Sequence, residues 1–251
     1  MQACSSAIVI ACCTLAIRTA TASEPKESFR DDFQHADRYA YRIQRETDGT
    51  ADEYGNTAPD DAAEVFFLPR TGCLYVEAAD NDSVTISRDV GAVTAGVLTV
   101  RFKPLALYPA NGTFTLSLRA REVDSGYVFG LAGGHYETPL RKRVCGRDAA
   151  GDTAKGPYFS TMDEIGGYNG EMTARWPIQN PQFYTVTLKF SPDRIEAFLD
   201  GRKVREAIDS DRTPLHIIAF SIRVDQMERL IDAIEFRPFL AIEKSPLSVT
   251  R

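Results

Sequence analysis

The chain alternates apolar and polar residues over many short runs, which is the pattern of β-strands buried on one face. In the run GVLTVRFKP, Leu98, Val100 and Phe102 share one face. Three further runs give inward-facing sets: Phe114, Leu116, Leu118 and Ala120; Tyr184, Val186, Leu188 and Phe190; and Ile218, Phe220, Ile222 and Val224. Shorter strand-like runs occur at 73–78, 83–89, 126–131, 194–199 and 230–236. Helical three-four spacing is scarce, so the pattern predicts an all-β protein.

The connections between these runs favour an antiparallel arrangement. Gly, Asp and Pro divide the runs, and Asp200-Gly201 separates two of them as a two-residue turn that requires positive φ. Many short antiparallel strands predict a two-sheet sandwich or a barrel, stabilised by burial between the sheets. Since no Pro/Ser-rich linker divides the chain, we expect one domain over 23–238 and a C-terminal tail over 239–251.

Alternation is weak between residues 132 and 182, and we expect a long irregular insertion there. It contains TMDEIGGYNGEM, residues 161–172, which gathers three carboxylates, a tyrosine and three glycines. An irregular segment of this length inside a compact domain is usually functional or disordered. We therefore look for ligand-binding residues in this insertion.

The amino terminus has the features of a signal peptide. The apolar run SSAIVIACCTLAI is followed by Ala20-Thr21-Ala22, with small residues at the positions that define cleavage. The run is too short to span a membrane. We expect residues 1–22 to be removed and the mature protein to be secreted, periplasmic or at the cell surface. A lipoprotein modified at Cys12 or Cys13 is the alternative.

Removal of the signal peptide would leave Cys73 and Cys145 as the cysteines of the mature chain. Exported proteins often pair their cysteines, so these two could form a disulfide. Two small buried thiols are the alternative, because the sequence does not place their Cα atoms within bridging distance.

Charge and motifs exclude several classes of function. The net charge of −6 at pH 7 argues against a nucleic-acid partner, whose phosphates need a basic face. The basic run Arg141-Lys142-Arg143 is interpreted as a solvated loop. The sequence has no zinc-ligand spacing, phosphate-binding glycine loop or Gly-x-Ser-x-Gly turn.

The closing third carries a family resemblance. WPIQNPQFYTVTLKFSPDRIEAFLDGRKV, followed by IIAFSIR and LIDAIEF, resembles the concanavalin A-like lectin and laminarin-G superfamily, and FRDDFQ resembles its first strand. The resemblance implies an antiparallel two-sheet jelly-roll sandwich in which the first strand pairs with the last. It also implies a concave face that relatives use to bind or cleave polysaccharides. The fold alone does not choose between these functions.

Sugar binding requires aromatic faces and a few planar polar groups. The candidate carbohydrate-binding residues are Arg119, Arg121, His135, Tyr136, Tyr168, Asn169 and Trp176. Trp176 has the alternative role of plugging the end of the sandwich, and Tyr127 is assigned to the core because it alternates with Phe129 and Leu131.

The sequence supports an enzymatic function less well than sugar binding. Retaining glucanases of this superfamily carry carboxylates at alternate strand positions, on one face. Asp163 and Glu164 are adjacent instead, and glycines separate them from Glu171. A polysaccharide lyase would need a cation and a base, for which Arg119, His135 and Tyr168 are the candidates.

A metal site is the remaining candidate. If the first and last strands pair, Asp31 or Asp32 approaches Asp232, and Asp32 with Asp232 could hold a structural Ca²⁺. The alternative is a pair of hydrogen-bonded or solvent-facing carboxylates.

The sequence is thus interpreted as an exported carbohydrate-binding β-sandwich without catalytic activity. A glycan-active enzyme, either a polysaccharide lyase or a glycoside hydrolase, is the first alternative. A structural surface protein is the second.

Overall fold

The computed structural model describes residues 28–34, 40–47, 63–107, 113–132, 140–151, 176–177 and 182–239. Within these ranges the chain forms fourteen antiparallel strands, and no helix there is long and apolar enough to cross a membrane. The strands are β1 (Phe29–Asp31), β2 (Arg42–Thr47), β3 (Ala63–Leu68), β4 (Cys73–Val93), β5 (Gly96–Leu107), β6 (Thr113–Ala120), β7 (Gly126–Ala132), β8 (Leu140–Val144), β9 (Arg147–Gly151), β10 (Trp176–Pro177), β11 (Tyr184–Ser191), β12 (Arg194–Leu199), β13 (Arg202–Ile208) and β14 (Ile217–Pro238).

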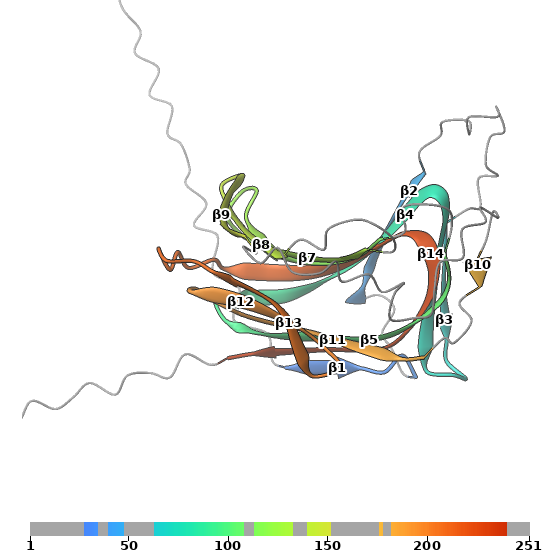
Figure 1. Ribbon diagram of the computed structural model, residues 1–251. Coiled ribbons are helices and arrows are strands. Elements are labelled where there is room, and N and C mark those ends of the chain that lie inside the picture. Colours follow the sequence, from blue (N-terminus) through green and yellow to red (C-terminus); the bar gives the residue numbers. More distant parts are fainter. Residues whose placement is uncertain are drawn as a thin grey trace, which may run out of the picture.

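The strands fold over into two layers (Figure 1). The first sheet has the order β2–β4–β14–β6–β7–β8–β9, and the second has the order β3–β4–β14–β5–β11–β12–β13. β1 is paired to β14, and β10 to β5, on the side of the second sheet. This is the jelly-roll sandwich that the alternation and the resemblance predicted.

Two long strands belong to both sheets. Residues 217–225 of β14 pair with β6 and with residues 83–93 of β4. Residues 227–238 of β14 then pair with β5. A register shift between Asp225 and Met227 marks the corner where β14 passes from one sheet to the other. The two layers therefore share one hydrogen-bonded framework.

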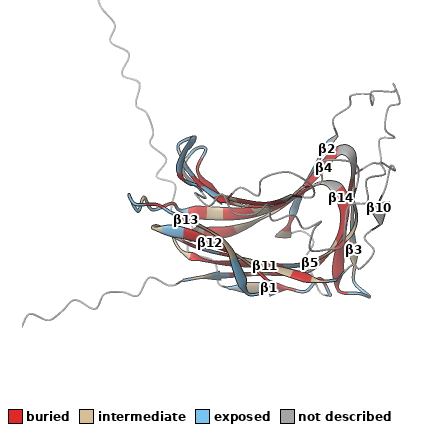
Figure 2. Cartoon of the chain, in the orientation of Figure 1, coloured by how far each residue is buried: buried red, intermediate tan, exposed pale blue. Residues whose placement is uncertain are grey.

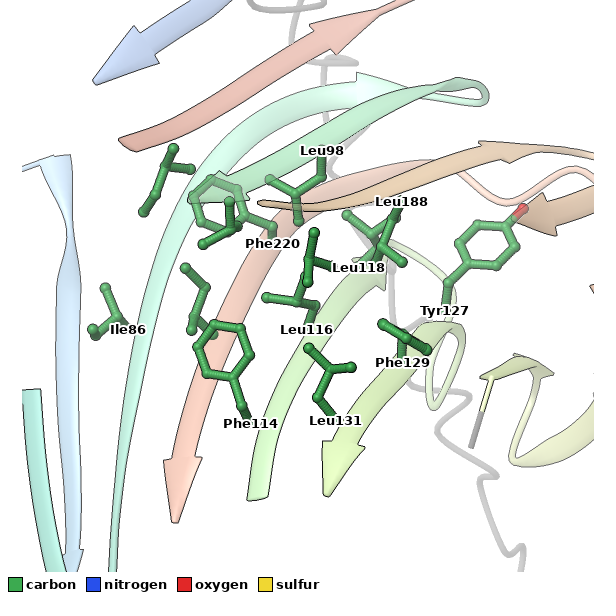
Figure 3. Packing of buried hydrophobic residues seen from close by; sticks show 14 of the residues in the cluster. Ile86, Leu98, Phe114, Leu116, Leu118, Tyr127, Phe129, Leu131, Leu188 and Phe220 are labelled. Carbon is green, nitrogen blue, oxygen red and sulfur yellow. The ribbon is translucent and has the colours of Figure 1, made fainter. Parts of the chain in front are cut away.

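The inner faces of both sheets form the core, and Figure 2 shows buried residues along the strands of both layers. Figure 3 shows Leu116 and Phe129 of the first sheet close to Leu98 and Leu188 of the second. All but one of the residues that the four alternating runs predicted as inward are buried. Tyr127 is buried as predicted.

The exception is Ile218, which is half-buried, while its neighbour Ile217 is fully buried. The register of β14 shifts between Ile217 and Ala219 against both neighbouring strands. Such a bulge changes which residue faces the core. Strict alternation counted back from Phe220 therefore predicts Ile218 as buried, whereas Ile217 takes that place.

The predicted turn at Asp200-Gly201 joins β12 to β13. Its φ angles are 47° at Asp200 and 80° at Gly201. Both values are positive, as a two-residue hairpin turn of this type requires.

The irregular insertion contains more regular structure than the sequence indicated. β8 and β9 form a hairpin inside residues 132–182, turning at Cys145-Gly146 with φ of 49° and 77°. The run Arg141-Lys142-Arg143 is part of β8 and is not a loop, and its Lys142 is buried.

Candidate functional site

The outer face of the first sheet carries a continuous set of polar side chains, which we call the polar face. The alternation that sends Leu116 and Phe220 into the core sends their neighbours outward. In Figure 1 the β8–β9 hairpin at one end of this sheet and β2 with β4 at the other rise on the same side of it. The polar face consists of Gln44, Glu46, Ser83, Thr85, Ser87, Thr113, Thr115, Ser117, Arg119, Ser221, Arg223 and Asp225.

Arg223 of β14 organises one end of the polar face. Its Nη1 donates to Oε2 of Glu46 at 2.8 Å, and its Nε donates to Oδ1 of Asp225 at 2.8 Å. The Thr113 hydroxyl donates to Oδ2 of Asp225 at 2.5 Å, and the Ser83 hydroxyl donates to Oε2 of Glu46 at 3.3 Å. Residues from four strands thus fix each other's side chains on this surface.

This network also sets the charge state of Glu46. The hydrogen bond from Arg223, together with its positive charge, lowers the pKa of the Glu46 carboxyl. Glu46 is therefore ionised at neutral pH and acts as a hydrogen-bond acceptor.

Three serines lie side by side next to this cluster. Ser221 of β14 is opposite Ser87 of β4 on one side and Ser117 of β6 on the other. All three are half-buried, and within the described part of the chain none of their hydroxyls has a protein hydrogen-bond partner. Neighbouring strands lie about 4.8 Å apart, so the three hydroxyls form a regular row of donors and acceptors.

Arg119 lies in the next row along β6. It is exposed, and its neighbours across the strands are Ala219 and Gly126, whose side chains are small or absent. Arg121 follows β6 and is also exposed, and its backbone N–H donates to the carbonyl of His216 at 2.8 Å. The structure therefore places Arg119 on the polar face, beside the serine row.

A histidine that sequence reasoning missed lies beside Arg121. The Nδ1 of His216 is 2.8 Å from Oε1 of Glu122, and the backbone N–H of His216 donates to Oε2 of the same carboxylate at 3.2 Å. Burial works to raise the pKa of Glu122, but hydrogen bonds from His216 leave it lowered. The paired carboxylate orients an exposed imidazole at this end of the sheet.

The remaining predicted ligand residues cannot be placed. His135, Tyr136, Tyr168 and Asn169 lie outside the described residues, as does the whole of TMDEIGGYNGEM. The backbone of Trp176 pairs with Leu107 in β10, and its side chain is outside the described part.

The seam between the first and last strands was the predicted metal site. β1 does pair with β14, and Phe29 lies opposite Phe236. The buried carboxylate is that of Asp31, which accepts hydrogen bonds from the Phe33 amide and the Tyr41 hydroxyl, both at 2.9 Å. Arg88 lies 3.6 Å from the same carboxylate.

The two residues of the predicted pair each have a partner of their own. Asp32 accepts a hydrogen bond from the Gln34 amide at 3.2 Å, whereas Asp232 forms an ion pair with Arg101. Arg88 lies beside Asp31 and Arg101 pairs with Asp232, so each of these two carboxylates has a positive charge next to it. Among the described residues, no group of three or more Asp, Glu, His or Cys could hold a metal ion.

Cys73 and Cys145 are both free thiols. Cys73 is buried beside Asp232, with its Sγ 3.9 Å from Oδ1, while Cys145 is exposed at the turn of the β8–β9 hairpin. The sequence left open either a disulfide or two small buried thiols. In the structure the two cysteines are not bonded to each other, and only Cys73 is buried.

No family model matches this chain, and no curated protein sequence matches it. Solved structures do resemble it. A β-glucanase from Bacillus licheniformis aligns with a TM-score of 0.52 and 12% identity, covering 85% of this chain and 99% of the glucanase. A native glycosidic hydrolase aligns with a TM-score of 0.53 and 11% identity, covering 86% and 98%.

A third chain, from work on endo-acting O-glycanases of the human gut microbiota, aligns with a TM-score of 0.52 and 10% identity, covering 84% of this chain and 99% of its own. At these identities the likeness shows the fold alone. The chain is a concanavalin A-like jelly-roll β-sandwich, the fold that its sequence resemblance implied.

Proposed function

We propose that this protein is an exported carbohydrate-binding module and that the polar face is the surface that contacts the saccharide. The observation that carries the proposal is the fixed array on that face, in which Arg223 holds Glu46 and Asp225 beside the row of serine hydroxyls. The likeness in fold to glycan-acting proteins supports the same class of ligand.

The chemistry of the polar face suits recognition of sugar hydroxyls. A hydroxyl both donates and accepts, so it can bond to a serine on one side and to an ionised carboxylate on the other. Hydrogen bonds to charged groups are stronger than neutral ones. Because Arg223 already orders Glu46 and Asp225, little side-chain entropy is lost when a ligand binds.

The charge state of Glu46 suits accepting hydrogen bonds and not donating a proton. A glycosidase needs one carboxylic acid whose pKa is raised, so that it can protonate the leaving oxygen. The pKa of Glu46 is lowered by Arg223, so this carboxyl is a poor proton donor. The expected role of Glu46 is to accept hydrogen bonds from the ligand.

A glycan-active enzyme is a second candidate, supported by the pair His216 and Glu122. A histidine oriented by a carboxylate is the usual arrangement of a general base, and Arg121 lies directly across the strands from His216. Arg119, near the end of β6, precedes Arg121 by two residues. A cation beside a base would suit proton abstraction next to a carboxylate.

The binding proposal is tested with the purified full chain on affinity gels and glycan arrays of plant, algal and bacterial polysaccharides. Ser221→Trp would fill the middle of the polar face, so we expect a loss of affinity of at least about tenfold. The matched control is Thr187→Trp, which places the same bulk on the outer face of the second sheet and should leave binding unchanged. Equal binding by both variants, or no binding to any polysaccharide, would contradict the proposal.

The enzyme candidate is tested on the same polysaccharides by reducing-sugar release and by ultraviolet absorbance of unsaturated uronates. If it holds, His216→Ala abolishes the product while binding persists. Absence of both products from the native protein would remove this candidate.

A further inference from the structure

Arg229 is an arginine enclosed between the two sheets. Its exposed fraction is 1%, and it lies in β14 just beyond the corner, opposite Val76 of β4 and Pro104 of β5. Its guanidinium carbon is 4.8 Å from the ring centre of Phe102 and 4.5 Å from that of Phe114. Both rings belong to the core, so the charge lies inside the sandwich and not on the polar face.

The nitrogen atoms of this guanidinium lack good hydrogen-bond acceptors. Nε lies 2.7 Å from the sulfur of Met227, which is a weak acceptor. Nη1 is buried and has no hydrogen-bond partner. Within the described part of the chain no carboxylate forms an ion pair with Arg229. The aromatic rings attract the cation, but they supply neither a negative charge nor an acceptor in the guanidinium plane.

A buried charge without a counter-charge is strongly unfavourable. Burial lowers the pKa of Arg229 to about 9, so the side chain is still charged at neutral pH. A hydrophobic residue of similar volume would fill the same space without this penalty. The charge and the unpartnered Nη1 together give this position an unmet demand for an anion.

We propose that Arg229 is the receptor for the carboxylate of a small ligand. A carboxylate matches the planar fork of a guanidinium through two parallel hydrogen bonds. The flanking Phe102 and Phe114 rings and the Met227 side chain suit a monoanion with an apolar or pyranose body. A phosphate dianion would lose more hydration on entering these surroundings.

The position of Arg229 suggests where such a ligand enters. Phe114 is the second residue of β6, and it pairs with Leu131, the penultimate residue of β7. Leu107 ends β5 opposite Met227. Arg229 therefore lies within a few residues of the end of the sandwich where β5 and β7 end and β6 begins. This site is separate from the polar face and does not depend on polysaccharide binding there.

The test is thermal unfolding of the full chain at constant ionic strength, with sodium acetate, sodium glucuronate or sodium chloride. A ligand that binds only the folded state raises Tm as its concentration exceeds Kd. At about a hundredfold excess over Kd we expect a rise on the order of 5–10 °C. Acetate alone raising Tm would identify a small free acid as the ligand class, and a larger rise with glucuronate would identify a sugar acid.

Two variants assign any rise to Arg229. Arg229→Met should unfold at the same temperature as the native protein or higher without ligand, and its Tm should no longer respond to either carboxylate. Arg237→Met, at an exposed position of the same strand, should keep the response. Calorimetric titration of the native protein with acetate and glucuronate is the direct measurement. The proposal is overturned if neither anion gives saturable heat or a larger Tm than chloride, or if Arg229→Met responds like the native protein.

Discussion

Lys142 and Asp209 form an ion pair in which both side chains are almost completely buried, with 1% and 2% exposed. The ammonium Nζ donates to Oδ2 of Asp209 at 2.5 Å and to the carbonyls of Pro192 at 2.7 Å and Thr213 at 2.6 Å. All three ammonium protons are therefore used. The pair ties β8 of the first sheet to the connections that follow β11 and β13 of the second.

Removing one member of this pair should destabilise the protein strongly. Asp209→Asn leaves the Lys142 charge buried without compensation, and we expect a loss of about 3–5 kcal/mol in the free energy of unfolding. The measurement is urea denaturation followed by circular dichroism. Arg143→Met, an exposed neighbour in β8, should change stability by less than about 0.5 kcal/mol. The double variant Lys142→Met/Asp209→Asn should recover much of the loss, because it removes the buried charge and keeps an acceptor for the backbone amides of Asp211 and Thr213. Failure to do so would show that the pair acts through something other than its charge.

Acid should weaken the fold through the same carboxylate. Burial works to raise the pKa of Asp209, but the hydrogen bond from Lys142 and those from the backbone leave it lowered. A carboxyl whose folded-state pKa is depressed contributes stability above its unfolded pKa of about 3.9, and this is lost as pH falls through the folded pKa. The Tm advantage of the native protein over Asp209→Asn should be constant from pH 5 to 8 and shrink below pH 4. An advantage that does not change down to pH 2 would refute this.

Gly126 should not accept any side chain. It has φ of 155°, and a Cβ there would lie 2.2 Å from the carbonyl oxygen of Leu118 on the neighbouring strand. Gly126→Ala should lower the free energy of unfolding by at least about 2 kcal/mol. Gly151, at the end of β9, has nothing within 4 Å of a Cβ, so Gly151→Ala should be neutral or stabilising by about 0.5 kcal/mol. Equal effects in chemical denaturation would contradict the proposed contact.

The hydrogen bond donated by the Tyr41 hydroxyl should contribute more to the free energy of unfolding than an ordinary hydrogen bond does. It donates to the buried Asp31 carboxylate at 2.9 Å, so Tyr41→Phe should lose about 1.5–3 kcal/mol in thermal unfolding. Tyr75 makes a comparable bond to Glu77 in a half-buried setting. Tyr75→Phe should lose less than about 1.5 kcal/mol. A smaller loss at Tyr41 than at Tyr75 would argue against the buried network.

Much of the fold could be predicted because period-two alternation is a local property. Leu116 and Leu118 are inward for the reason that the sequence indicates, and Asp200-Gly201 is a turn whose chemistry is visible in two residues. The β8–β9 hairpin could not be predicted in this way. Its turn uses Cys145 at positive φ, and Cys is not a residue that marks such turns. The buried residue of β8 in this hairpin's centre is Lys142. A lysine is accommodated in the core here only because it pairs with Asp209, which is distant in the sequence.

The candidate site was predictable only in part, because it depends on strand register. Arg119 could be identified as outward-facing from β6 alone. Arg223 forms a hydrogen bond with Glu46, although 177 residues separate them in the sequence. This contact can be predicted only when β2 and β14 are both known to pair with β4. Asp232 lies at the register shift between Ile231 and Ala233, where it forms an ion pair with Arg101, and no local pattern marks that shift.

The placement of β14 has a consequence for the order in which the protein can be made. β1, β4, β5 and β6 all pair with β14, and β14 is the last of the described strands. A nascent chain that has emerged only as far as His216 holds the other thirteen described strands, but it lacks the strand that pairs with four of them. Contacts of such long sequence separation form late and slowly. If the chain is exported as we propose, its sandwich should close only after nearly all of it has crossed the membrane.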